Sequence, residues 1–451
     1  MKVSIAGAGY VGLVSGLCLA DRGHTVVCVD TDKQKVARIN NADGPIYEAG
    51  LDGLLADNIG KSLFATTDLH SAVLDSEVTL IAVGTPFDGT EIDLSYIEVV
   101  AQQIGQALRD KSSYHVVIVK STVTPGTTDS IVVPILEAES QKTVGEGFGV
   151  GMNPEFLREG EAISDFMNPD RIVLGGYDDK TLRVMAEMYE PFGGVDIVET
   201  TNKTAEMIKY ASNSLLATLI SFSNEVANLC TNIGDIDATE VMHGVHLDKR
   251  FSPIMDDGSR VHPASITYLE AGCGFGGSCF PKDVKALIAH GQKNGNPMLL
   301  LDAVMEINSH QPQQVMNLLA KHFDSFVGIK VAMMGLAFKP GTDDMRESPA
   351  IPIVARLREG GATIRAYDPA ARSEAEELFG YDRIVYCDEI DEALVDPATS
   401  EPVDAVLLMT SWPQFAELPA LIHKMEQQPV LIDGRRMIDK NDVARYEGIG
   451  C

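Results

Sequence analysis

The sequence lacks long apolar runs, an excess of basic residues and closely spaced cysteine pairs. No apolar run approaches the ~18 residues that a membrane-spanning helix needs, so we expect no membrane association. The 451 residues include 36 Lys and Arg against 65 Asp and Glu, and the formal net charge of −29 argues against a nucleic-acid partner. The seven cysteines contain no CxxC pair. We therefore expect reduced thiols, no metal site and a cytoplasmic protein.

A chain of this length predicts two or three domains. In its first part, apolar strand-like runs alternate with helical stretches, at Lys2–Ala6, Thr25–Asp30, Val78–Val83 and Val116–Val119. Such alternation predicts a parallel sheet with helices on both faces. Turn residues Gly84–Pro86 and Ser121–Gly126 follow two of these strands, at the edge where ligands bind such sheets.

A helical segment without breakers runs from about Thr201 to Cys230, with more apolar residues than one buried face needs. We expect a helix shared between domains or subunits. After about Gly328 the opening pattern returns, since KVAMMGLAF (Lys330–Phe338) is similar to KVSIAGAGY (Lys2–Tyr10). Ala362–Pro369, Asp404–Met409 and Val430–Asp433 predict further strands. The second sheet has an altered glycine turn and need not bind a dinucleotide.

Gly7–Gly12 (GAGYVG) forms a GxGxxG motif directly after the first predicted strand and opens a helix. Gly7 permits the tight turn, Gly9 the close approach of a pyrophosphate, and Gly12 the packing of helix on strand. The helix N-terminus attracts the phosphates. Asp30 ends the second strand, where an acid binds the ribose and repels a 2′-phosphate, which favours NAD over NADP. A glycine turn without a ligand is the less favoured alternative.

The segment GCGFGGSCFPKD (Gly272–Asp283) is a glycine-rich loop that runs into a helix. Pro281 suits the first helical turn, which Ser278 or Cys279 can cap. A thiol at a helix N-terminus beside Lys282 is expected to have a lowered pKa and to act as a nucleophile. Asp283 lies on the same helical face, four residues after Cys279. The alternative is a buried structural cysteine beside a flexible loop. Taken alone that is the commoner case, but such cysteines rarely have a glycine run and a lysine-containing helix start around them.

Two further pairs have the i,i+4 spacing of one helix face. Glu155 and Glu159 lie just past Pro154, and Lys209 and Asn213 lie on the long helix. The alternative for each is an ordinary solvated pair. Apolar neighbours surround Lys209, and a semi-buried lysine can stabilise a developing oxyanion.

Seven motifs occur in order along the chain: GAGYVG, GTP, STVTPGTT, NPEFLREGEA, the Lys209/Asn213 helix, GFGGSCFPKD and GLAFKPGTDDMRESP. With them the whole chain resembles the UDP-glucose/GDP-mannose dehydrogenase family, most closely its bacterial UDP-glucose 6-dehydrogenase branch. The resemblance implies an α/β fold of two Rossmann-like, doubly wound parallel-sheet domains joined by a long central helix. Its implied parts are an NAD-binding domain (1–200), a helical connector and dimerisation region with the catalytic cysteine (201–310) and a UDP-binding domain (311–451). A homodimer or higher homo-oligomer is implied as well.

The implied reaction is the four-electron, NAD-dependent oxidation of the nucleotide sugar UDP-glucose to UDP-glucuronate, through a thiohemiacetal and a thioester on Cys279. Oxidation of GDP-mannose or of a UDP-N-acetylhexosamine requires the same residues and stays open. A two-electron β-hydroxyacid dehydrogenase would need no thiol, and a nucleotide-binding scaffold would need no catalytic residues. Cys279, Lys209 and Asp283 together argue against both. Polysaccharide biosynthesis is the pathway expected by family analogy.

The resemblance assigns roles residue by residue. Cys279 is the implied nucleophile, Lys209 and Asn213 polarise the C6 oxygen, and Asp283 with Thr122 and Glu155 positions or activates water. The implied NAD contacts are Gly7, Gly9, Tyr10, Val11, Gly12, Asp30, Lys35, Thr85, Thr122, Glu159, Lys282 and Arg346. The implied substrate contacts are Glu155, Phe156, Leu157, Arg158, Glu159, Lys209, Asn213, Arg250, Tyr268, Leu269, Gly272, Gly276, Phe338 and Lys339, with Lys339 on the diphosphate.

One segment departs from the family pattern. Asp248-Lys249-Arg250 is followed by FSPIMDDGSRVHPASIT before Tyr268, a longer stretch than is usual, and Glu270 stands where asparagine is common. Arg250 and Arg260 compete for the role of the arginine that reaches the partner subunit's sugar. The segment shapes the sugar pocket, so the identity of the sugar depends on it.

Overall fold

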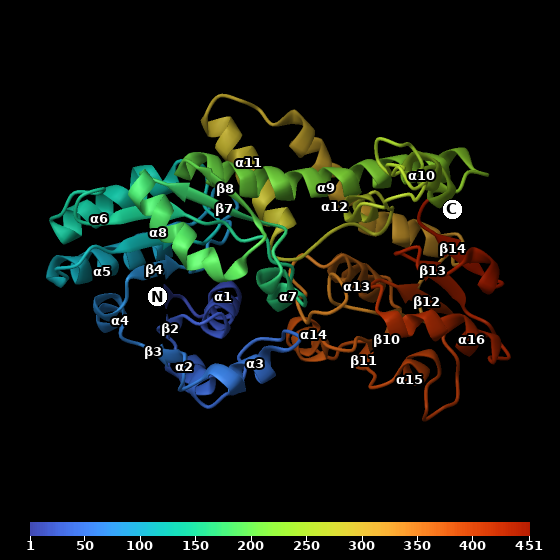
Figure 1. The fold of residues 1–451 in the computed structure, drawn as a ribbon. Helices are drawn as coiled ribbons and strands as arrows, with labels where there is room; N and C mark the ends of the chain where they lie inside the picture. The colour runs from blue at the N-terminus through green and yellow to red at the C-terminus, as the bar shows by residue number, and fades with distance from the viewer. The chain divides into compact units, whose positions relative to one another are not determined.

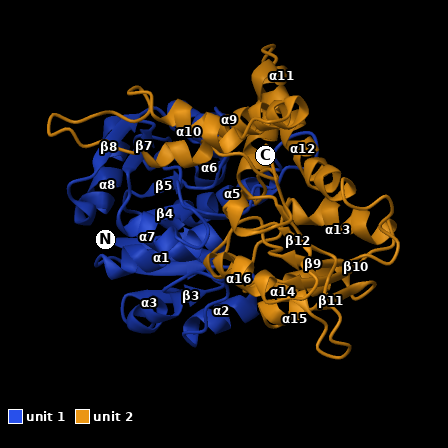
Figure 2. Ribbon diagram, turned by 90° about the vertical axis from the view of Figure 1, so that its right-hand side faces the viewer, with its two compact units in different colours: residues 1–212 blue, residues 213–451 orange.

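The computed structural model describes residues 1–451, which divide into two compact units, Met1–Ser212 and Asn213–Cys451 (Figure 2). Helix α9 (Asn202–Ile233) begins in the first unit and ends in the second, which confirms the predicted long helix. No helix in either unit combines the length with the apolar character that crossing a membrane requires.

The first unit is built on an eight-stranded sheet (Figure 1). Its strands are β1 (Lys2–Ala6), β2 (Thr25–Val29), β3 (Leu63–Thr66), β4 (Val78–Ile81), β5 (Val116–Val119), β6 (Gly149–Met152), β7 (Arg171–Gly176) and β8 (Asp196–Thr200). Its helices are α1 (Tyr10–Asp21), α2 (Lys33–Asn40), α3 (Leu51–Asn58), α4 (Leu69–Asp75), α5 (Ser95–Asp110), α6 (Val133–Ser140), α7 (Ala162–Met167) and α8 (Asp179–Tyr189).

The strand order is β3-β2-β1-β4-β5-β6-β7-β8, and its first six strands have the doubly wound arrangement that was predicted. β7 runs antiparallel to β6, which differs from the purely parallel sheet expected. Apolar runs predict strands but carry no information on their direction. Side chains alternate between the two faces: on β5, Val116 and Ile118 enter one apolar core, and Val117 and Val119 enter the other.

The second unit contains a six-stranded, all-parallel sheet in the order β11-β10-β9-β12-β13-β14. Its strands are β9 (Lys330–Met334), β10 (Thr363–Tyr367), β11 (Ile384–Tyr386), β12 (Ala405–Leu408), β13 (Val430–Asp433) and β14 (Tyr446–Gly448). Its helices are α10 (Ala238–His246), α11 (Phe280–Lys293), α12 (Leu299–Ala320), α13 (Ala350–Glu359), α14 (Arg372–Phe379), α15 (Ile390–Leu394) and α16 (Leu418–His423).

This order repeats the doubly wound arrangement of the first sheet and confirms the predicted second α/β unit. On β9, Val331 and Met333 enter one core, whereas Ala332 and Met334 enter the other. Gly335 follows β9 at φ +92°, where a Cβ would lie 2.4 Å from the Cβ of Thr410. The altered turn therefore keeps a glycine at the position directly after the strand, where its backbone requires one.

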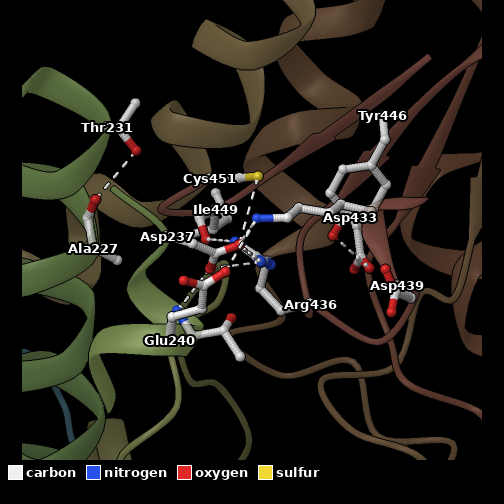
Figure 3. Close-up of polar contacts among 12 residues, drawn as sticks. Ala227, Thr231, Asp237, Glu240, Asp433, Arg436, Asp439, Tyr446, Ile449 and Cys451 are labelled. Carbon is white, nitrogen blue, oxygen red and sulfur yellow. Dashed lines mark hydrogen bonds and ion pairs between the residues drawn. The ribbon is translucent and has the colours of Figure 1, made fainter. Parts of the chain in front are cut away.

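Asp237, which precedes α10, ties this helix to the loop after β13 (Figure 3). Its carboxylate accepts hydrogen bonds from Arg436 at 2.9 Å, from Lys440 at 2.7 Å and from the Thr239 amide at 2.9 Å. Burial by itself raises the pKa of Asp237, but these hydrogen bonds outweigh it and lower the pKa to about 2. The last residues of the chain join the same cluster, since the Ala238 amide donates to the Gly450 carbonyl at 2.8 Å.

Candidate active site

The glycine turn after β1 requires glycine at two of its three motif positions. Gly7 has φ +102°, and a Cβ there would lie 2.6 Å from the Ala82 carbonyl oxygen, while a Cβ on Gly12 would lie 1.9 Å from the Gly7 carbonyl oxygen. At Gly9, by contrast, a Cβ would meet nothing within 4 Å. The turn thus leaves open space at Gly9, beside the first amides of α1, whose N-cap provides no side chain. This arrangement fits the pyrophosphate of a dinucleotide.

Asp30, directly after β2, lies beside this turn. Its carboxylate accepts the Ala8 amide at 3.1 Å and the Lys35 ammonium at 2.9 Å. Burial raises the pKa of Asp30, but the hydrogen bonds from the Asp32 amide and from Lys35 outweigh it, so that the pKa lies below its usual value. The carboxylate is ionised at neutral pH and fits the ribose-binding, phosphate-repelling acid that was predicted. Lys35 lies against Asp30.

The turns after β4 and β5 meet at the carboxyl edge of the sheet, as predicted. The Thr85 hydroxyl donates to the Thr122 carbonyl at 2.7 Å, and the Ser121 hydroxyl donates to the Val83 carbonyl at 2.7 Å. Thr85 follows β4, at the point between β1 and β4 where the strand order reverses, and Thr122 follows the adjacent strand β5. Doubly wound sheets bind their ligands at this edge.

Glu155 follows β6 and forms an ion pair with Lys209 of α9. The Glu155 Oε1 to Lys209 Nζ distance is 2.8 Å, and both side chains are buried. The Leu157 amide donates to the other carboxylate oxygen at 2.6 Å. Burial raises the pKa of Glu155, yet the charge and hydrogen bond of Lys209 outweigh it and keep the pKa below its usual value. Because both side chains are buried, the alternative of an ordinary solvated pair is wrong for Glu155 and for Lys209.

The predicted helical pairing of Glu155 with Glu159 is wrong. The segment from Asn153 to Glu161 is irregular, and α7 begins only at Ala162. The i,i+4 spacing of two glutamates is a weak indication of a helix, and tertiary contacts outweigh it here. The loop bends so that the Glu155 carboxylate points at Lys209 instead.

The rest of this loop is held by side chains from several elements. Arg171 stacks on the Phe156 ring, 3.9 Å from its centroid, and Arg158 pairs with Asp165 at 2.6 Å. The Gly160 amide donates to the Tyr10 hydroxyl at 2.9 Å and to Glu48 at 2.8 Å. Tyr10, one of the three non-glycine residues of the glycine motif, thus joins the dinucleotide turn to the loop that carries Glu155. The sequence did not reveal Glu48, since no local pattern marks it.

In the second unit, Cys279 is the N-cap residue of α11 and its side chain is partly exposed. Its side chain makes no capping hydrogen bond, so the first amides of α11 are not occupied by the thiol. The Ser278 hydroxyl lies 3.6 Å from the Cys279 sulfur. Five of the other six cysteines are buried, and burial raises the pKa of Cys18 and Cys28 to about 12. Cys279 is therefore the thiol that combines partial exposure with a helix N-terminus.

Asp283 lies one turn into α11 and is 1 % exposed. It accepts hydrogen bonds from Asn213 at 2.6 Å and from Lys282 at 2.6 Å, and its amide donates to the Cys279 carbonyl at 2.8 Å. Three predicted catalytic residues of this unit, Asn213, Cys279 and Asp283, are thereby brought together. Lys282 is held on Asp283.

The glycine-rich loop before Cys279 packs on the segment after β9. A Cβ on Gly276 would lie 2.3 Å from the Glu347 carbonyl oxygen, and one on Gly277 would lie 2.7 Å from the Phe338 ring. The Gly277 amide donates to the Arg346 carbonyl at 2.7 Å. Predicted cofactor and substrate residues from two distant parts of the sequence therefore meet. Arg346 itself pairs with Asp344 at 2.8 Å.

Arg435, after β13, connects the glycine-rich loop to the segments that follow β9 and β12. Its guanidinium donates to the carbonyls of Gly274 at 3.0 Å, Phe338 at 3.0 Å and Met409 at 2.7 Å. The Gly272 amide donates to the side-chain oxygen of Asn224 in α9 at 2.8 Å. No local pattern in the sequence marks Arg435, because only the tertiary fold brings these three carbonyls to one guanidinium.

The long segment before Tyr268 distinguishes the two competing arginines. Arg260 pairs with Ile254 in an antiparallel bridge, and its side chain donates to the carbonyls of Leu247 at 2.8 Å and Ser252 at 2.9 Å. The Arg250 side chain is 85 % exposed and contacts only its neighbour Asp248, at 2.5 Å. Arg260 is therefore used within the segment, whereas Arg250 extends into solvent.

Three family models match successive parts of the chain. They describe the UDP-glucose/GDP-mannose dehydrogenase family: its NAD binding domain matches residues 1–193, its central domain residues 203–310 and its UDP binding domain residues 332–440. The cofactor is thus NAD, and the last domain indicates a nucleotide-sugar substrate.

Individual proteins are similar over the full chain. The sequence is 41 % identical over 454 residues to the UDP-glucose 6-dehydrogenase AglM of Haloferax volcanii, with 100 % of both chains covered. It is 39 % identical over 456 residues to the UDP-glucose 6-dehydrogenase TuaD of Bacillus subtilis, covering 100 % of this chain and 93 % of that protein. The solved UDP-glucose dehydrogenase of Pyrobaculum islandicum has a TM-score of 0.89 at 36 % identity, covering 100 % of this chain and 97 % of that one. The chain is an NAD-dependent nucleotide-sugar dehydrogenase and belongs to the UDP-glucose/GDP-mannose dehydrogenase family.

Proposed function

We propose that this protein oxidises the C6 alcohol of UDP-glucose to a carboxylate in two successive oxidations, with Cys279 as the covalent nucleophile. The observation that carries the proposal is the partly exposed thiol at the N-terminus of α11, one turn before the buried Asp283–Asn213 pair. A single alcohol oxidation needs no nucleophile, whereas a route to the acid through a thioester does. The relatives named UDP-glucose 6-dehydrogenase support the choice of sugar.

The NAD site is proposed on the glycine turn of the first unit. Gly7, Gly9 and Gly12 with the α1 amides would hold the pyrophosphate, and Asp30 would bind the ribose. Tyr10, Val11, Lys35, Thr85, Thr122, Glu159, Lys282 and Arg346 are the other proposed contacts. Bound NAD⁺ supplies the hydride acceptor for each of the two oxidations.

Residues of the chain would bind the C6 oxygen, form the covalent intermediate and position the hydrolytic water. Lys209 and Asn213 would hold the C6 oxygen, where the lysine ammonium stabilises negative charge as the hydroxyl proton leaves. The Cys279 sulfur then adds to the aldehyde carbon, and the resulting thiohemiacetal loses a second hydride and a proton to become a thioester. Asp283, with Thr122 and Glu155, would position the water that adds to the thioester carbonyl. Cleavage of the carbon–sulfur bond releases the acid and returns the thiol.

The substrate site is proposed on both sides of Cys279 in the sequence. Tyr268, Leu269, Gly272 and Gly276 would contact the sugar and nucleotide, with Phe338, and Lys339 would reach the diphosphate. The proposed substrate contacts of the first unit are Glu155, Phe156, Leu157, Arg158 and Glu159. Arg250, which is exposed, would reach the sugar bound by a partner subunit.

A homodimer is proposed from the surface of α9. Leu215, Phe222 and Leu229 are each at least half exposed and follow one another at seven-residue spacing, which places them on one helix face. A row of exposed large apolar residues is unfavourable in water and fits a second copy of the chain. A cytoplasmic location is proposed because all seven cysteines are free thiols.

A substrate panel tests the proposed function. NADH formation would be followed with UDP-glucose, UDP-galactose, UDP-N-acetylglucosamine, UDP-N-acetylmannosamine and GDP-mannose. We expect turnover with UDP-glucose and little with the others. GDP-mannose is the informative competitor, because the GDP-mannose 6-dehydrogenase of Pseudomonas aeruginosa is also 41 % identical, over 371 residues. Turnover confined to another sugar would show that the Arg250–Gly272 segment selects a different substrate.

A further inference from the structure

Lys120 is a buried lysine of the first unit to which the proposed mechanism gives no role. It follows β5 directly and is 3 % exposed. Its ammonium donates to the side-chain oxygen of Asn153 at 2.9 Å. The parallel register pairs Val119 with Met152, so Lys120 and Asn153 are neighbours at the carboxyl edge of the sheet.

The surroundings of Lys120 hold it in place without neutralising it. Asn153 is fixed from two sides, since its amide donates to the Val173 carbonyl at 2.9 Å and its oxygen accepts the Tyr189 hydroxyl at 2.5 Å. The Phe166 ring lies 5.6 Å from the ammonium. Lys120 makes no ion pair. A buried ammonium without a carboxylate partner is costly, and an apolar residue of similar size would be cheaper.

The charged groups that act on Lys120 are the two proposed site residues. Burial lowers the pKa of Lys120 to about 8, attraction by Glu155 opposes this shift, and repulsion by Lys209 adds to it. In return, the positive charge of Lys120 contributes to the lowered pKa of Glu155. Tyr189, reached through Asn153, is the other titratable group, and burial raises its pKa so that it stays neutral. Glu155 and Lys209 cancel each other's charge, so Lys120 gives this buried cluster a net positive charge.

We propose that Lys120 is a positioning residue that acts through Glu155 and Lys209 by supplying the surplus positive charge of the cluster. The inference rests on the proposed function, in which negative charge develops on the C6 oxygen held by Lys209. A neutral cluster would stabilise that oxygen less than a cluster with a net positive charge. Lys120 is not proposed to contact the substrate, because its ammonium is hydrogen-bonded to Asn153.

The direct test is the titration of Glu155 in protein labelled with carbon-13 at the glutamate carboxyl, observed by NMR and assigned with Glu155→Gln. In Lys120→Met the Glu155 pKa should rise by about one pH unit, the order of shift that one charge causes in a protein interior. Lys111→Met is the matched control. Lys111 is also a buried lysine, but its ammonium donates to the carbonyls of Val73, Leu74 and Ser76, and its charged neighbours are Asp75, Glu77 and Lys142.

A second variant covers the case in which Lys120→Met does not fold. Asn153→Asp places a carboxylate on Lys120 and cancels the surplus charge while the lysine stays in place. It should raise the Glu155 pKa in the same direction, whereas Lys120→Arg should leave that pKa unchanged. An unchanged Glu155 titration in Lys120→Met or Asn153→Asp would overturn the proposal.

Activity gives a separate measurement. In Lys120→Met we expect kcat to fall at least about tenfold at neutral pH and the acidic limb of its pH profile to move upward by about one unit, with a smaller change in KM. Lys111→Met should keep the wild-type profile. If the wild-type protein oxidises no nucleotide sugar, the proposed function fails, and the NMR titration still decides the electrostatic role of Lys120.

Discussion

The side-chain amide of Asn213 donates a 2.6 Å hydrogen bond to the buried carboxylate of Asp283. Lys282 donates to the other oxygen of that carboxylate at 2.6 Å. Two donors thus fix an aspartate one helical turn from Cys279, on the same face of α11. The geometry suits a group that orients or deprotonates water next to a sulfur-bound intermediate.

Asp283→Asn should therefore slow hydrolysis of the thioester more than the oxidations that form it. General-base catalysis contributes about 10²–10⁴-fold, and a loss of this order is expected in steady-state kcat. Rapid mixing should reveal a burst of NADH before the slow phase, and mass spectrometry should find the sugar attached to Cys279. A variant that is slow from the first turnover, without a burst, would place Asp283 in an earlier step.

Asp30 is expected to set the choice between NAD and NADP. Asp30→Ser removes a carboxylate that would bind the ribose hydroxyl and repel a 2′-phosphate. The ratio of kcat/KM for NAD to that for NADP should fall about 10- to 100-fold. Asp43→Ser is the control, because Asp43 is exposed and pairs with Arg38. An unchanged ratio in Asp30→Ser would show that another group reads the ribose.

Asp237 should make the second unit sensitive to acid. Its pKa is about 2 in the folded protein against an ordinary value of 3.8, so the unfolded chain binds the proton more readily. Its stabilising contribution is complete above about pH 4 to 5 and is lost as the pH falls towards 2. Asp237→Asn should lower the free energy of unfolding by about 2 kcal/mol at neutral pH, and the difference from wild type should shrink with acidification.

Urea unfolding at several pH values measures this difference. Glu240→Gln is the control, since Glu240 is 79 % exposed and lies 3.5 Å from Lys440. An equal loss in Asp237→Asn at every pH would assign the effect to the changed packing and hydrogen bonding of the side chain rather than to its charge.

The exposed face of α9 predicts the oligomeric state. Leu229→Asp should convert a dimer into a monomer at micromolar concentration, because an unpaired carboxylate would be buried in the interface. Light scattering measures the mass directly. Val327→Asp is the control, as Val327 is 77 % exposed and lies outside α9. A monomeric wild-type protein would contradict the proposed homodimer.

Local patterns predicted local structure well. The turn at Gly7–Gly12 and the start of α11 at Cys279–Pro281 depend on neighbouring residues, and both were found where they were expected. The repeated strand pattern also predicted the second sheet. The antiparallel β7 was missed, since strand direction depends on the path of the connection rather than on composition.

Contacts between distant parts of the sequence were beyond such patterns. The Glu155–Lys209 ion pair joins a loop after β6 to α9, and it replaced the helical pair predicted from the spacing of Glu155 and Glu159. Glu48 and Arg435 also act through partners far away in the sequence. Lys120 carries no motif of its own, and only its burial and its contact with Asn153 single it out.

The covalent role of Cys279 has its own mutational test. Cys279→Ser removes the nucleophile but keeps a hydroxyl of similar size at the N-cap. We expect complete loss of the acid product, with the aldehyde or a trapped adduct detected by mass spectrometry. Acid formation at the wild-type rate would mean that the second oxidation does not require the thiol.

The ratio of NADH formed to UDP-glucose consumed tests the covalent route through Cys279. A limiting amount of sugar would be exhausted with excess NAD⁺, and both NADH and the remaining sugar would be measured. Passage through a thioester to the acid requires two hydride transfers, so we expect two NADH per sugar. One NADH per sugar would contradict it, since the enzyme would then stop at a two-electron product and Cys279 would have no covalent role.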